Sequence, residues 1–333
     1  MSVLYNTDYD DEPTVDASSV ETSARAIAGA LVAAGHAAEL VGVHGREVFD
    51  VLATLSSSPP DLVFNLCESM AGDARNEPTL AGLLDLFGLR YTGCDLPALA
   101  ACLHKRRSKD ILLGRGIPTP PHRYLATAAD LADPGLERLD YPWFLKLGHE
   151  DASVGITEAN LVRDAAALRA RAGAMIAEYE QPVLAERYVE GREINVTLIG
   201  NGANLAVLPL HEIDFGAMPA GRPRIVSYAA KWDEMHVDYA GTKPVPLRDA
   251  NPALVSACET VARAAWDAHG LRDYARVDLR IDQAGQPWVI DVNPNPDISP
   301  DAGVARSAAV AGMSYVQLIQ RIADAAWARP ARA

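Results

Sequence analysis

The sequence lacks a hydrophobic run long enough to cross a membrane. Although 49% of its 333 residues are hydrophobic, no stretch approaches the roughly 20 consecutive apolar residues that a bilayer requires. Residues 1–16 are acidic, and no basic segment precedes an apolar one, so a signal peptide is not expected. We therefore expect a cytoplasmic protein without membrane partners, built as two or three domains with their own cores.

Cysteine pairs and an excess of positive charge are also missing. The four cysteines, Cys67, Cys94, Cys102 and Cys258, show no C-x-x-C spacing, which indicates reduced thiols in a cytosolic protein. The chain has 30 basic and 44 acidic side chains and a net charge of −14. Such a field repels nucleic acid on average, so no nucleic-acid partner is expected. A local basic cleft for a nucleotide with its metal remains compatible with this charge.

Strands and helices alternate in the first part of the chain. Apolar strands are predicted at 2–6, 38–43 and 61–67, with an edge strand at 89–92, and helices at 18–34, 47–55 and 79–87. This order indicates a parallel sheet with right-handed crossovers, covered on both faces. We predict an N-terminal domain over residues 1–94 that lies on the substrate side of the site.

Two further domains are predicted, a central one over 95–182 and a C-terminal one over 183–333. The central domain would contain one long basic helix at 96–115, a proline-rich linker at 116–121, a strand at 143–147, a loop at 148–155 and a helix at 161–177. In the last domain we expect strands at 182–188, 193–199 and 205–210, helices at 252–270 and 313–327, and a hairpin of 275–282 with 287–293. Residues 211–247 are polar and proline-rich, which predicts a functional or mobile loop.

The predicted hairpin holds the strongest chemical pattern. Arg276 and Asp278 alternate on its first strand, and Asp291 and Asn293 alternate on the second, so each pair faces one side of the sheet. Two carboxylates and an amide oxygen suit Mg²⁺, which is usually shared with phosphate. The neighbouring Arg276 suits an oxyanion or a transferring phosphoryl group. The alternative is a surface cluster of salt bridges, against which the apolar flanks of both strands argue.

Lysines and a small-residue loop form a second pattern. Lys146 lies in the apolar strand WFLKL, where a phosphate would supply the partner that an interior lysine needs. Ser153 belongs to the following loop, whose small residues allow backbone N–H groups to approach phosphate. Lys105 and Lys231 are further candidate cations. Taken singly, each lysine is better explained as an ordinary solvated surface charge, and the loop alone is a weak signal.

A third pattern is VLAERYVEGREINV, over 183–196. Glu186 ends one predicted strand and Glu193 begins the next. A carboxylate in such a place accepts hydrogen bonds from a ribose, and the backbone of 187–189 is suited to an adenine edge. The alternative is a pair of ordinary glutamates at strand ends.

The ordered series of motifs resembles the ATP-grasp superfamily, and within it the D-alanine–D-alanine ligase group. The segments that carry the resemblance are LLDLFGLRYTGCD (83–95), HKRRSKDILLGRGIPTP (104–120), YPWFLKLGHEDASVG (141–155), VLAERYVEGREINV (183–196), AAKW (229–232), RVDLR (276–280), VIDVNPNP (289–296) and AGMSYVQLIQRI (311–322). The resemblance covers nearly the whole chain. It implies an α/β ATP-grasp fold of three domains, the last with a mainly antiparallel sheet, and ATP between the last two.

The resemblance also implies a role for each matching residue. Lys105 and Lys146 would hold the ATP phosphates, Lys231 the γ-phosphate, and Ser153 with its loop would cover them. Adenine would lie against Glu186, Tyr188 and Val189, and the ribose against Glu193. The metal ligands would be Asp278, Asp291 and Asn293, which would bind two Mg²⁺, and Mn²⁺ would substitute for them. Arg276, Lys231 and Ser153 would be the catalytic side chains.

Departures from the family pattern fall at the expected amino-acid positions. They are Ser18 near the place of a glutamate, Cys67 in place of a histidine, Ala152 in place of a serine, Trp232 in place of a tyrosine, Asp297 in place of a glycine, and Ala302 near the place of a serine. We infer the same acyl-phosphate chemistry on small-molecule substrates other than the D-alanine pair. The alternatives are a genuine D-alanine–D-alanine ligase, a ligase for a specialised metabolite, a phosphotransferase and a non-catalytic nucleotide-binding module.

Water must be excluded from an acyl-phosphate, and residues 211–247 are the predicted lid. The candidate substrate contacts are Cys67, Glu68, His211, Trp232 and Asp297, with Glu212 and Asp214 as further candidates in the lid. For the lid residues, an ordinary solvated loop is the alternative. The resemblance further implies a homodimer.

Overall fold

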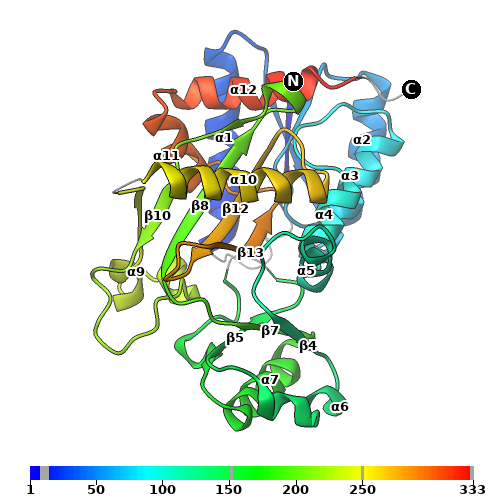
Figure 1. Cartoon of the computed structure of the whole chain (residues 1–333). Coiled ribbons are helices and arrows are strands. Elements are labelled where there is room, and N and C mark those ends of the chain that lie inside the picture. The colour runs from blue at the N-terminus through cyan, green and yellow to red at the C-terminus, as the bar shows by residue number, and fades with distance from the viewer. Residues whose placement is uncertain (8–14, 151–152, 249–250, 331–333) are drawn as a thin grey trace.

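The computed structural model describes residues 1–7, 15–150, 153–248 and 251–330, and in residues 15–19 the backbone only. Its strands form three sheets, one parallel and two antiparallel. Figure 1 shows the large antiparallel sheet in the middle of the molecule and the smaller one below it. The alternation of apolar and polar segments therefore predicts the α/β class correctly.

The N-terminal sheet has the order β2-β1-β3, and its strands are parallel. Its elements are β1 (Ser2–Asn6), α1 (Val15–Ala33), β2 (Glu39–Val43), α2 (Val48–Ser57), β3 (Val63–Asn65) and α3 (Glu77–Leu86). Helical crossovers are needed here because two parallel strands cannot be joined by a tight turn. The expected edge strand at 89–92 is reduced to one bridge, between Val63 and Tyr91.

The expected long helix at 96–115 is wrong, because it consists of α4 (Leu96–Leu103) and α5 (Lys105–Gly114). His104 separates them with an extended backbone, φ −86° and ψ 90°. The backbone N–H of Lys105 then donates to the carbonyl of Gly148 at 3.1 Å. This break therefore brings the start of α5 against the loop that follows the strand at 143–147.

The smaller antiparallel sheet has the order β4-β7-β5-β6. Its strands are β4 (His122–Leu125), β5 (Trp143–Leu147), β6 (Leu161–Val162) and β7 (Val183–Arg187), and its helices are α6 (Ala128–Leu131) and α7 (Ala165–Tyr179). The predicted helix at 161–177 thus begins with a short strand, and β4 was not predicted. Helix α7 packs its buried side chains Leu168, Ala172 and Met175 against one face of this sheet. The opposite face of the sheet is turned toward the large sheet (Figure 1).

The large sheet has the order β11-β10-β8-β12-β13, with β9 paired to β8. Its strands are β8 (Arg192–Ile199), β9 (Ala206–Val207), β10 (His211–Asp214), β11 (Lys243–Pro246), β12 (Tyr274–Ile281) and β13 (Pro287–Asn293). The helices that cover it are α10 (Pro252–His269), α11 (Gly303–Val310) and α12 (Tyr315–Trp327). The predicted hairpin is confirmed, and the strand expected at 205–210 is reduced to β9.

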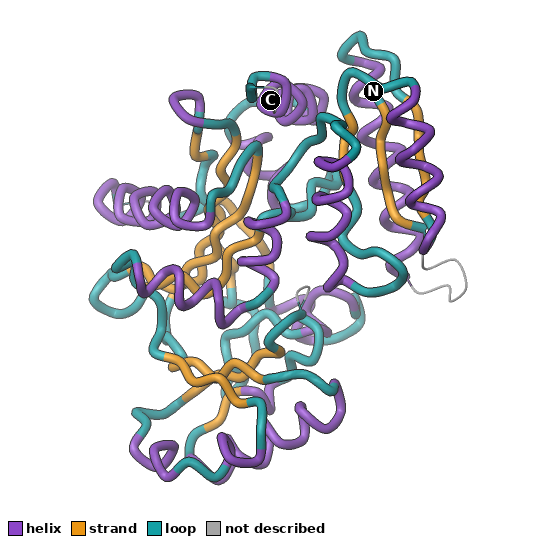
Figure 2. Tube along the Cα trace, turned by 90° about the vertical axis from the view of Figure 1, so that its right-hand side faces the viewer, coloured by secondary structure: helices purple, strands orange, loops and turns teal. Residues whose placement is uncertain are grey.

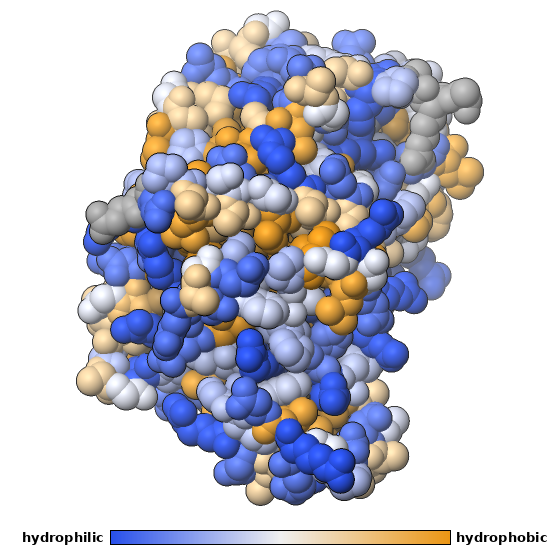
Figure 3. Space-filling view, in the orientation of Figure 1, coloured by the Kyte–Doolittle hydropathy of each residue, from blue (hydrophilic) through white to orange (hydrophobic). Residues whose placement is uncertain are grey.

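Two apolar cores tie the large sheet to the N-terminal domain. Helix α10 packs Cys258, Ala262 and Trp266 into a core shared with α3 and α4. On the other side, α12 packs against α1, in a core that includes Ile27 and Ile319. Figure 2 shows the N-terminal strands and their helices standing beside the large sheet, and Figure 3 shows apolar side chains in a band at the level of α10 on a mainly hydrophilic face. The domain boundaries at 94 and 182 stay predictions.

Residues 211–247 are not a structureless loop. They contain β10, α8 (Tyr228–Trp232), α9 (Val237–Gly241) and β11. The hydroxyl of Ser227 accepts from the N–H of Ala230 at the start of α8 and donates to the carboxylate of Asp238 at 2.8 Å. Arg222 pairs with the same carboxylate. We call residues 227–241 the α8–α9 cap; polar side chains order it, which is why hydrophobic periodicity missed it.

None of the helices in the described parts of the chain is both long and apolar enough to span a bilayer. The four cysteines are buried, and none of them is joined to another in a disulfide.

Candidate active site

The β12–β13 hairpin forms the floor of the site. Arg276 lies opposite Asn293, and Asp278 lies opposite Asp291, with an irregularity in the register just after Asp278. Directly opposed residues of antiparallel strands point to the same face. The structure therefore brings together the four residues that the sequence grouped.

Asp278 is held by three neighbours. Its carboxylate accepts two hydrogen bonds from Arg276, at 2.7 and 2.9 Å. The amides of Asn293 and Asn195 donate to it at 3.0 and 2.7 Å. These contacts fix the carboxylate on the face that the site uses. Because the amide nitrogen of Asn293 is turned toward Asp278, its amide oxygen is left for another partner.

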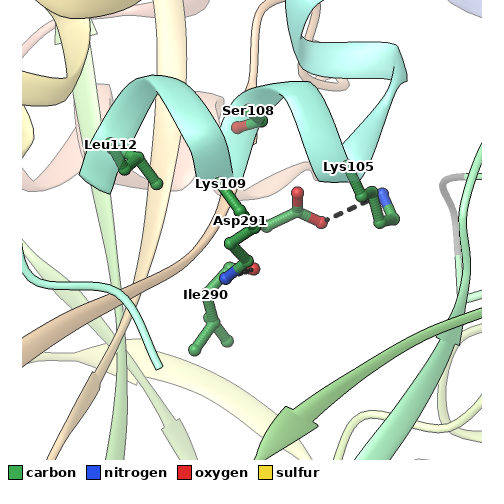
Figure 4. A pocket seen from close by; sticks show the side chains of 6 residues that line it. All are labelled: Lys105, Ser108, Lys109, Leu112, Ile290 and Asp291. Carbon is green, nitrogen blue, oxygen red and sulfur yellow. Dashed lines mark hydrogen bonds and ion pairs between the residues drawn. The ribbon is translucent and has the colours of Figure 1, made fainter. Parts of the chain in front are cut away.

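Asp291 faces the start of α5 rather than Arg276. Its carboxylate lies 3.6 Å from the ammonium of Lys105, across a small pocket lined also by Lys109 and Ile290 (Figure 4). Burial alone would raise the pKa of Asp291, but Lys105, Lys146 and Lys109 outweigh it and lower that pKa to about 2. Asp291 is therefore an anion at neutral pH, as a metal ligand must be.

A buried network of lysines surrounds Glu186. The ammonium of Lys146 lies 2.7 Å from one carboxylate oxygen, and that of Lys109 lies 2.8 Å from the other. Burial raises the pKa of Glu186, but the two ammonium groups outweigh it, and the pKa lies below its ordinary value. For Lys146, burial lowers the pKa, but Glu186 and Asp291 outweigh it and the pKa is raised. For Lys109 the burial effect dominates and the pKa is lowered.

The same lysines connect three parts of the fold. Lys146 of β5 donates to the carbonyl of Ile290 on β13 at 3.2 Å, and Lys109 of α5 donates to the carbonyl of Val289 at 3.0 Å. Buried lysines need such partners, because a desolvated ammonium without an acceptor is costly. Glu186 Oε2 is buried and accepts no well-directed hydrogen bond from the described residues. It lies 2.8 Å from the ammonium of Lys109, so this ion pair is its charge partner inside the protein.

Glu193 lies on β8, next to the β7–β8 linker that holds Tyr188 and Val189. Its carboxylate pairs with Arg280 at 3.1 Å, and its side chain is only 13% exposed. Burial raises the pKa of Glu193, and Arg280 opposes this rise. Lys231 of α8 also lowers this pKa through its charge, so the α8–α9 cap lies within electrostatic reach of Glu193.

The loop after β5 is joined to the α8–α9 cap. Ser153 has a left-handed backbone, φ +63°, and its hydroxyl donates to the carbonyl of Val226 at 3.1 Å. The N–H of Tyr228 donates to the carbonyl of Ile156 at 3.0 Å. The loop and the cap therefore form one side of the site. Ala152, one of the departures, lies outside the described residues, as does the side chain of Ser18.

The candidate substrate contacts lie in different surroundings. Cys67 is completely buried after β3, whereas the adjacent Glu68 is exposed. Trp232 is 39% exposed on α8, and Asp297 is exposed and accepts from the N–H of Ser299 at 2.8 Å. The expectation that His211 belongs to a loop is wrong: it is buried on β10, with Nδ1 2.9 Å from the hydroxyl of Ser307 on α11.

Three residues of the site were not singled out by sequence reasoning: Lys109, Asn195 and Arg280. Lys109 had a readable signal, because it shares a helical face with Lys105 and Leu112 at spacings of four and three. Asn195 and Arg280 gave none, since a polar residue in an amphipathic strand looks like a solvent-facing one until its neighbours are known.

The donors present fit the expected metal and nucleotide. Two carboxylates and an amide oxygen on one sheet face are the hard ligands that Mg²⁺ prefers. Within the described residues there is no group of three or more His, Cys, Asp or Glu side chains placed to hold a metal, which is consistent with a site whose third protein ligand is an amide. The roles of the individual residues stay predictions.

Comparison with known proteins places these features in a family. The family model "D-ala D-ala ligase C-terminus" matches residues 111–324. The chain is 31% identical to the D-alanine–D-alanine ligase of Gloeobacter violaceus over 304 residues, which cover 91% of this chain and 92% of that protein. It is 33% identical to the uncharacterized protein y4sG of Sinorhizobium fredii, over 81% of this chain and 78% of that protein.

Among solved structures, the chain is similar to the Bacillus anthracis D-alanine–D-alanine ligase complexed with ATP. The TM-score is 0.75 at 20% sequence identity, and the similarity covers 98% of this chain and 97% of that one. This similarity shows that the three sheets have the arrangement found in that fold.

Proposed function

Because this chain belongs to the D-alanine–D-alanine ligase family of ATP-grasp enzymes, which form carbon–nitrogen bonds at the expense of ATP, we propose that it joins a carboxylate to an amine other than the pair of D-alanines. The observation that supports the reaction class is the charged network of Lys105, Lys146, Glu186 and Asp291 where the two antiparallel sheets meet. The support for other substrates is that the departures fall outside this network.

The proposed reaction proceeds through an acyl-phosphate. A carboxylate is a poor acyl donor, and transfer of the γ-phosphoryl group of ATP gives it a good leaving group. Lys105, Lys146 and Lys231 neutralise charge on the phosphates during transfer. Asp278, Asp291 and Asn293 would hold two Mg²⁺, which supply further charge neutralisation when bound. Mn²⁺ would serve in the same donor set.

The second step forms the amide. The amine attacks the acyl-phosphate, and Arg276, fixed by its two bonds to Asp278, stabilises the oxyanion. Phosphate then leaves, so the products are the amide, ADP and phosphate. The α8–α9 cap and the loop at Ser153 would exclude water, and Glu68, Trp232 and Asp297 are the proposed contacts of the two small-molecule substrates.

The test is a screen for ADP release with purified protein, ATP and Mg²⁺ against single amino acids and pairs. D-alanine alone is one arm of the screen. We expect an amino-acid or amino-acid-like pair other than D-alanine to give the highest kcat/KM, and mass spectrometry to detect the amide. D-alanine as the best substrate would contradict the substrate proposal and leave the reaction class intact. A phosphorylated product without an amide would indicate a phosphotransferase instead.

A variant at the hairpin tests the metal proposal. We expect Asp291→Ala to lower turnover by at least about 10³-fold, because it removes a charge that must face the transferring phosphoryl group. Circular dichroism and the thermal midpoint serve as controls for folding. Normal turnover in a folded Asp291→Ala protein would overturn the assignment.

A homodimer is proposed from the family resemblance. Light scattering on the purified protein tests this directly, with a mass twice that of the chain as the expected result.

A further inference from the structure

Arg280 occupies the centre of the predicted nucleoside side of the site. It lies on β12, two residues after Asp278, and is only 3% exposed. Its guanidinium donates to four acceptors: to the carbonyl of Val189 at 3.0 Å, the carboxylate of Glu193 at 3.1 Å, the hydroxyl of Tyr188 at 2.6 Å and the carbonyl of Arg224 at 3.0 Å. A single buried side chain therefore joins three segments of the chain.

These segments are the ones expected to surround the nucleoside. Tyr188 and Val189 belong to the β7–β8 linker, and Glu193 is the second residue of β8. Arg224 precedes the α8–α9 cap. The hydroxyl of Tyr188 also donates to the carbonyl of Arg224 at 3.0 Å, so the linker contacts the approach to the cap directly as well as through Arg280.

Aromatic rings complete the surroundings of the guanidinium. The rings of Tyr188 and Phe215 lie with their centroids 4.9 and 5.8 Å from its central carbon. A planar guanidinium stacks on aromatic faces while it donates in its own plane. An ammonium in the same place would have three donors and no plane, so it would not serve all four acceptors at once.

We infer that Arg280 is a positioning residue for the nucleotide: it sets the carboxylate of Glu193 and the backbone of Val189 in the arrangement that binds the nucleoside, and it fastens the approach to the α8–α9 cap to the same point. This inference rests on the proposed function, because it takes Glu193 as the acceptor for a ribose hydroxyl. Arg280 itself acts through Glu193, Val189 and Arg224.

The physical reason is the burial of Glu193. A carboxylate that is 13% exposed loses most of its hydration, and a cation with a directed hydrogen bond offsets that loss. The remaining lone pairs of the carboxylate are then available in a fixed direction. Without Arg280, Glu193 would turn toward water or toward Lys231, and the ribose would lose an oriented acceptor.

The test compares Arg280→Met, Arg280→Lys and Glu193→Gln with the unaltered protein. ATP is compared with 2′-deoxyATP and 3′-deoxyATP. We expect Arg280→Met to raise the KM for ATP by at least about tenfold while kcat changes by less than about threefold, since the lost bonds act on nucleotide binding. In Arg280→Met we also expect a lower preference for ATP over the deoxy analogue that lacks the bound hydroxyl. In Arg280→Lys this preference is expected to lie between that of Arg280→Met and that of the unaltered protein.

A double variant separates positioning from a merely structural role. If Arg280 acts through Glu193, Arg280→Met lowers the preference for ATP over the deoxy analogue less in the Glu193→Gln background than in the unaltered protein. Arg192→Met is the matched control, because Arg192 precedes Glu193 on β8, so that its side chain points to the opposite face of the strand, and it pairs with Glu212 of β10. The preference of Arg192→Met for ATP over the deoxy analogue is expected to equal that of the unaltered protein.

An unchanged KM and an unchanged preference in folded Arg280→Met would overturn the inference. Should Arg280→Met fail to fold, Tyr188→Phe removes one of the four contacts of Arg280 and is expected to lower the preference for ATP over the deoxy analogue by a smaller factor. An unchanged preference in Tyr188→Phe would also contradict the inference. Calorimetric binding of a non-hydrolysable ATP analogue and its deoxy form needs no amino substrate. It therefore tests Arg280 even where the amide-forming reaction is not found.

Discussion

At the scale of single residues, Glu186 shows how a buried charge is made tolerable. The two lysines on either side of it come from different elements, Lys109 from α5 and Lys146 from β5, and both also bond carbonyls of β13. Removal of one partner from such a group leaves an uncompensated charge, which is more destabilising than replacement of the whole cluster by apolar residues.

Lys109 was not singled out in the sequence, and its importance is testable. We expect Lys109→Met to lower the free energy of unfolding by about 3 kcal/mol, because Glu186 loses one of its two cations. Urea unfolding of the purified variant measures this. Lys243→Met, at an exposed lysine of β11, is the control and is expected to change stability little. Equal midpoints for the two variants would contradict the view of Lys109 as a structural partner.

The charge on Asp291 predicts a pH dependence. Its pKa is lowered to about 2 in the folded protein, whereas an unfolded aspartate titrates near 4. The stabilisation from this difference, about 2 kcal/mol, is present above about pH 4 and is lost as the pH falls toward 2. We therefore expect the stability difference between the unaltered protein and Asp291→Asn to shrink between pH 5 and pH 3 without divalent metal. A difference that stays constant over this range would exclude the lysine pairing.

At the scale of elements, the α8–α9 cap is held by one buried carboxylate. Asp238 is 6% exposed and binds Arg222, which lies before the cap, and Ser227, which lies at its start. Large apolar side chains of the cap, Met235 at 94% and Tyr228 at 49%, are exposed. Polar contacts, rather than a core of its own, therefore set its structure.

We expect Asp238→Asn to loosen the cap and uncouple the reaction. Hydrogen exchange across 215–242 rises, because Arg222 and Ser227 lose their charged partner. More ADP is released per amide formed, since water reaches the acyl-phosphate. Peptide-level hydrogen exchange and the ADP-to-amide ratio measure both effects. Glu234→Gln, on the exposed side of the cap, is expected to leave the hydrogen exchange and the ADP-to-amide ratio unchanged. An equal ADP-to-amide ratio in Asp238→Asn and Glu234→Gln would contradict the role of the cap as a lid.

The break between α4 and α5 is another property of elements. Helical periodicity continues through 96–115, so a single helix is the natural prediction. The extended backbone at His104 is stable only because Lys105 N–H finds the carbonyl of Gly148. That partner is 43 positions away in the chain, and no local pattern specifies it.

At the scale of the whole molecule, Asp273 joins the N-terminal domain, the large sheet and the C-terminal segment. It is completely buried and accepts from the N–H of Gly93 at 2.8 Å and the amide of Asn201 at 2.9 Å, and it pairs with Arg329 at 3.2 Å. Its backbone is left-handed, φ +64°, which Asp and Asn tolerate better than other side chains.

Asp273→Asn removes the charge and keeps the backbone preference. We expect a loss of about 3 kcal/mol in the free energy of unfolding, because Arg329 is left without its carboxylate. Urea unfolding followed by tryptophan fluorescence measures it. The exposed Asp267→Asn on α10 is the control. An equal stability of the two variants would show that the charge of Asp273 is not needed to hold the domains together.

How much was predictable follows from the range of each interaction. The hairpin with Arg276, Asp278, Asp291 and Asn293 was predicted, because its turn and its alternation are local. The elements of 211–247 were not, because Ser227, Arg222 and Asp238 order them through polar contacts that have no periodic signature. For the same reason Arg280 passed unnoticed.

The sequence by itself determined the α/β class, the floor of the site and, through its ordered motifs, the family. These depend on alternation, turn residues and motif order, all of which are properties of short segments. Only the tertiary structure decided which cation meets which carboxylate: Lys109 with Glu186, Lys105 with Asp291, and Arg280 with Glu193. A buried ion pair joins side chains that are distant in the chain, and its geometry exists only once the sheets have packed.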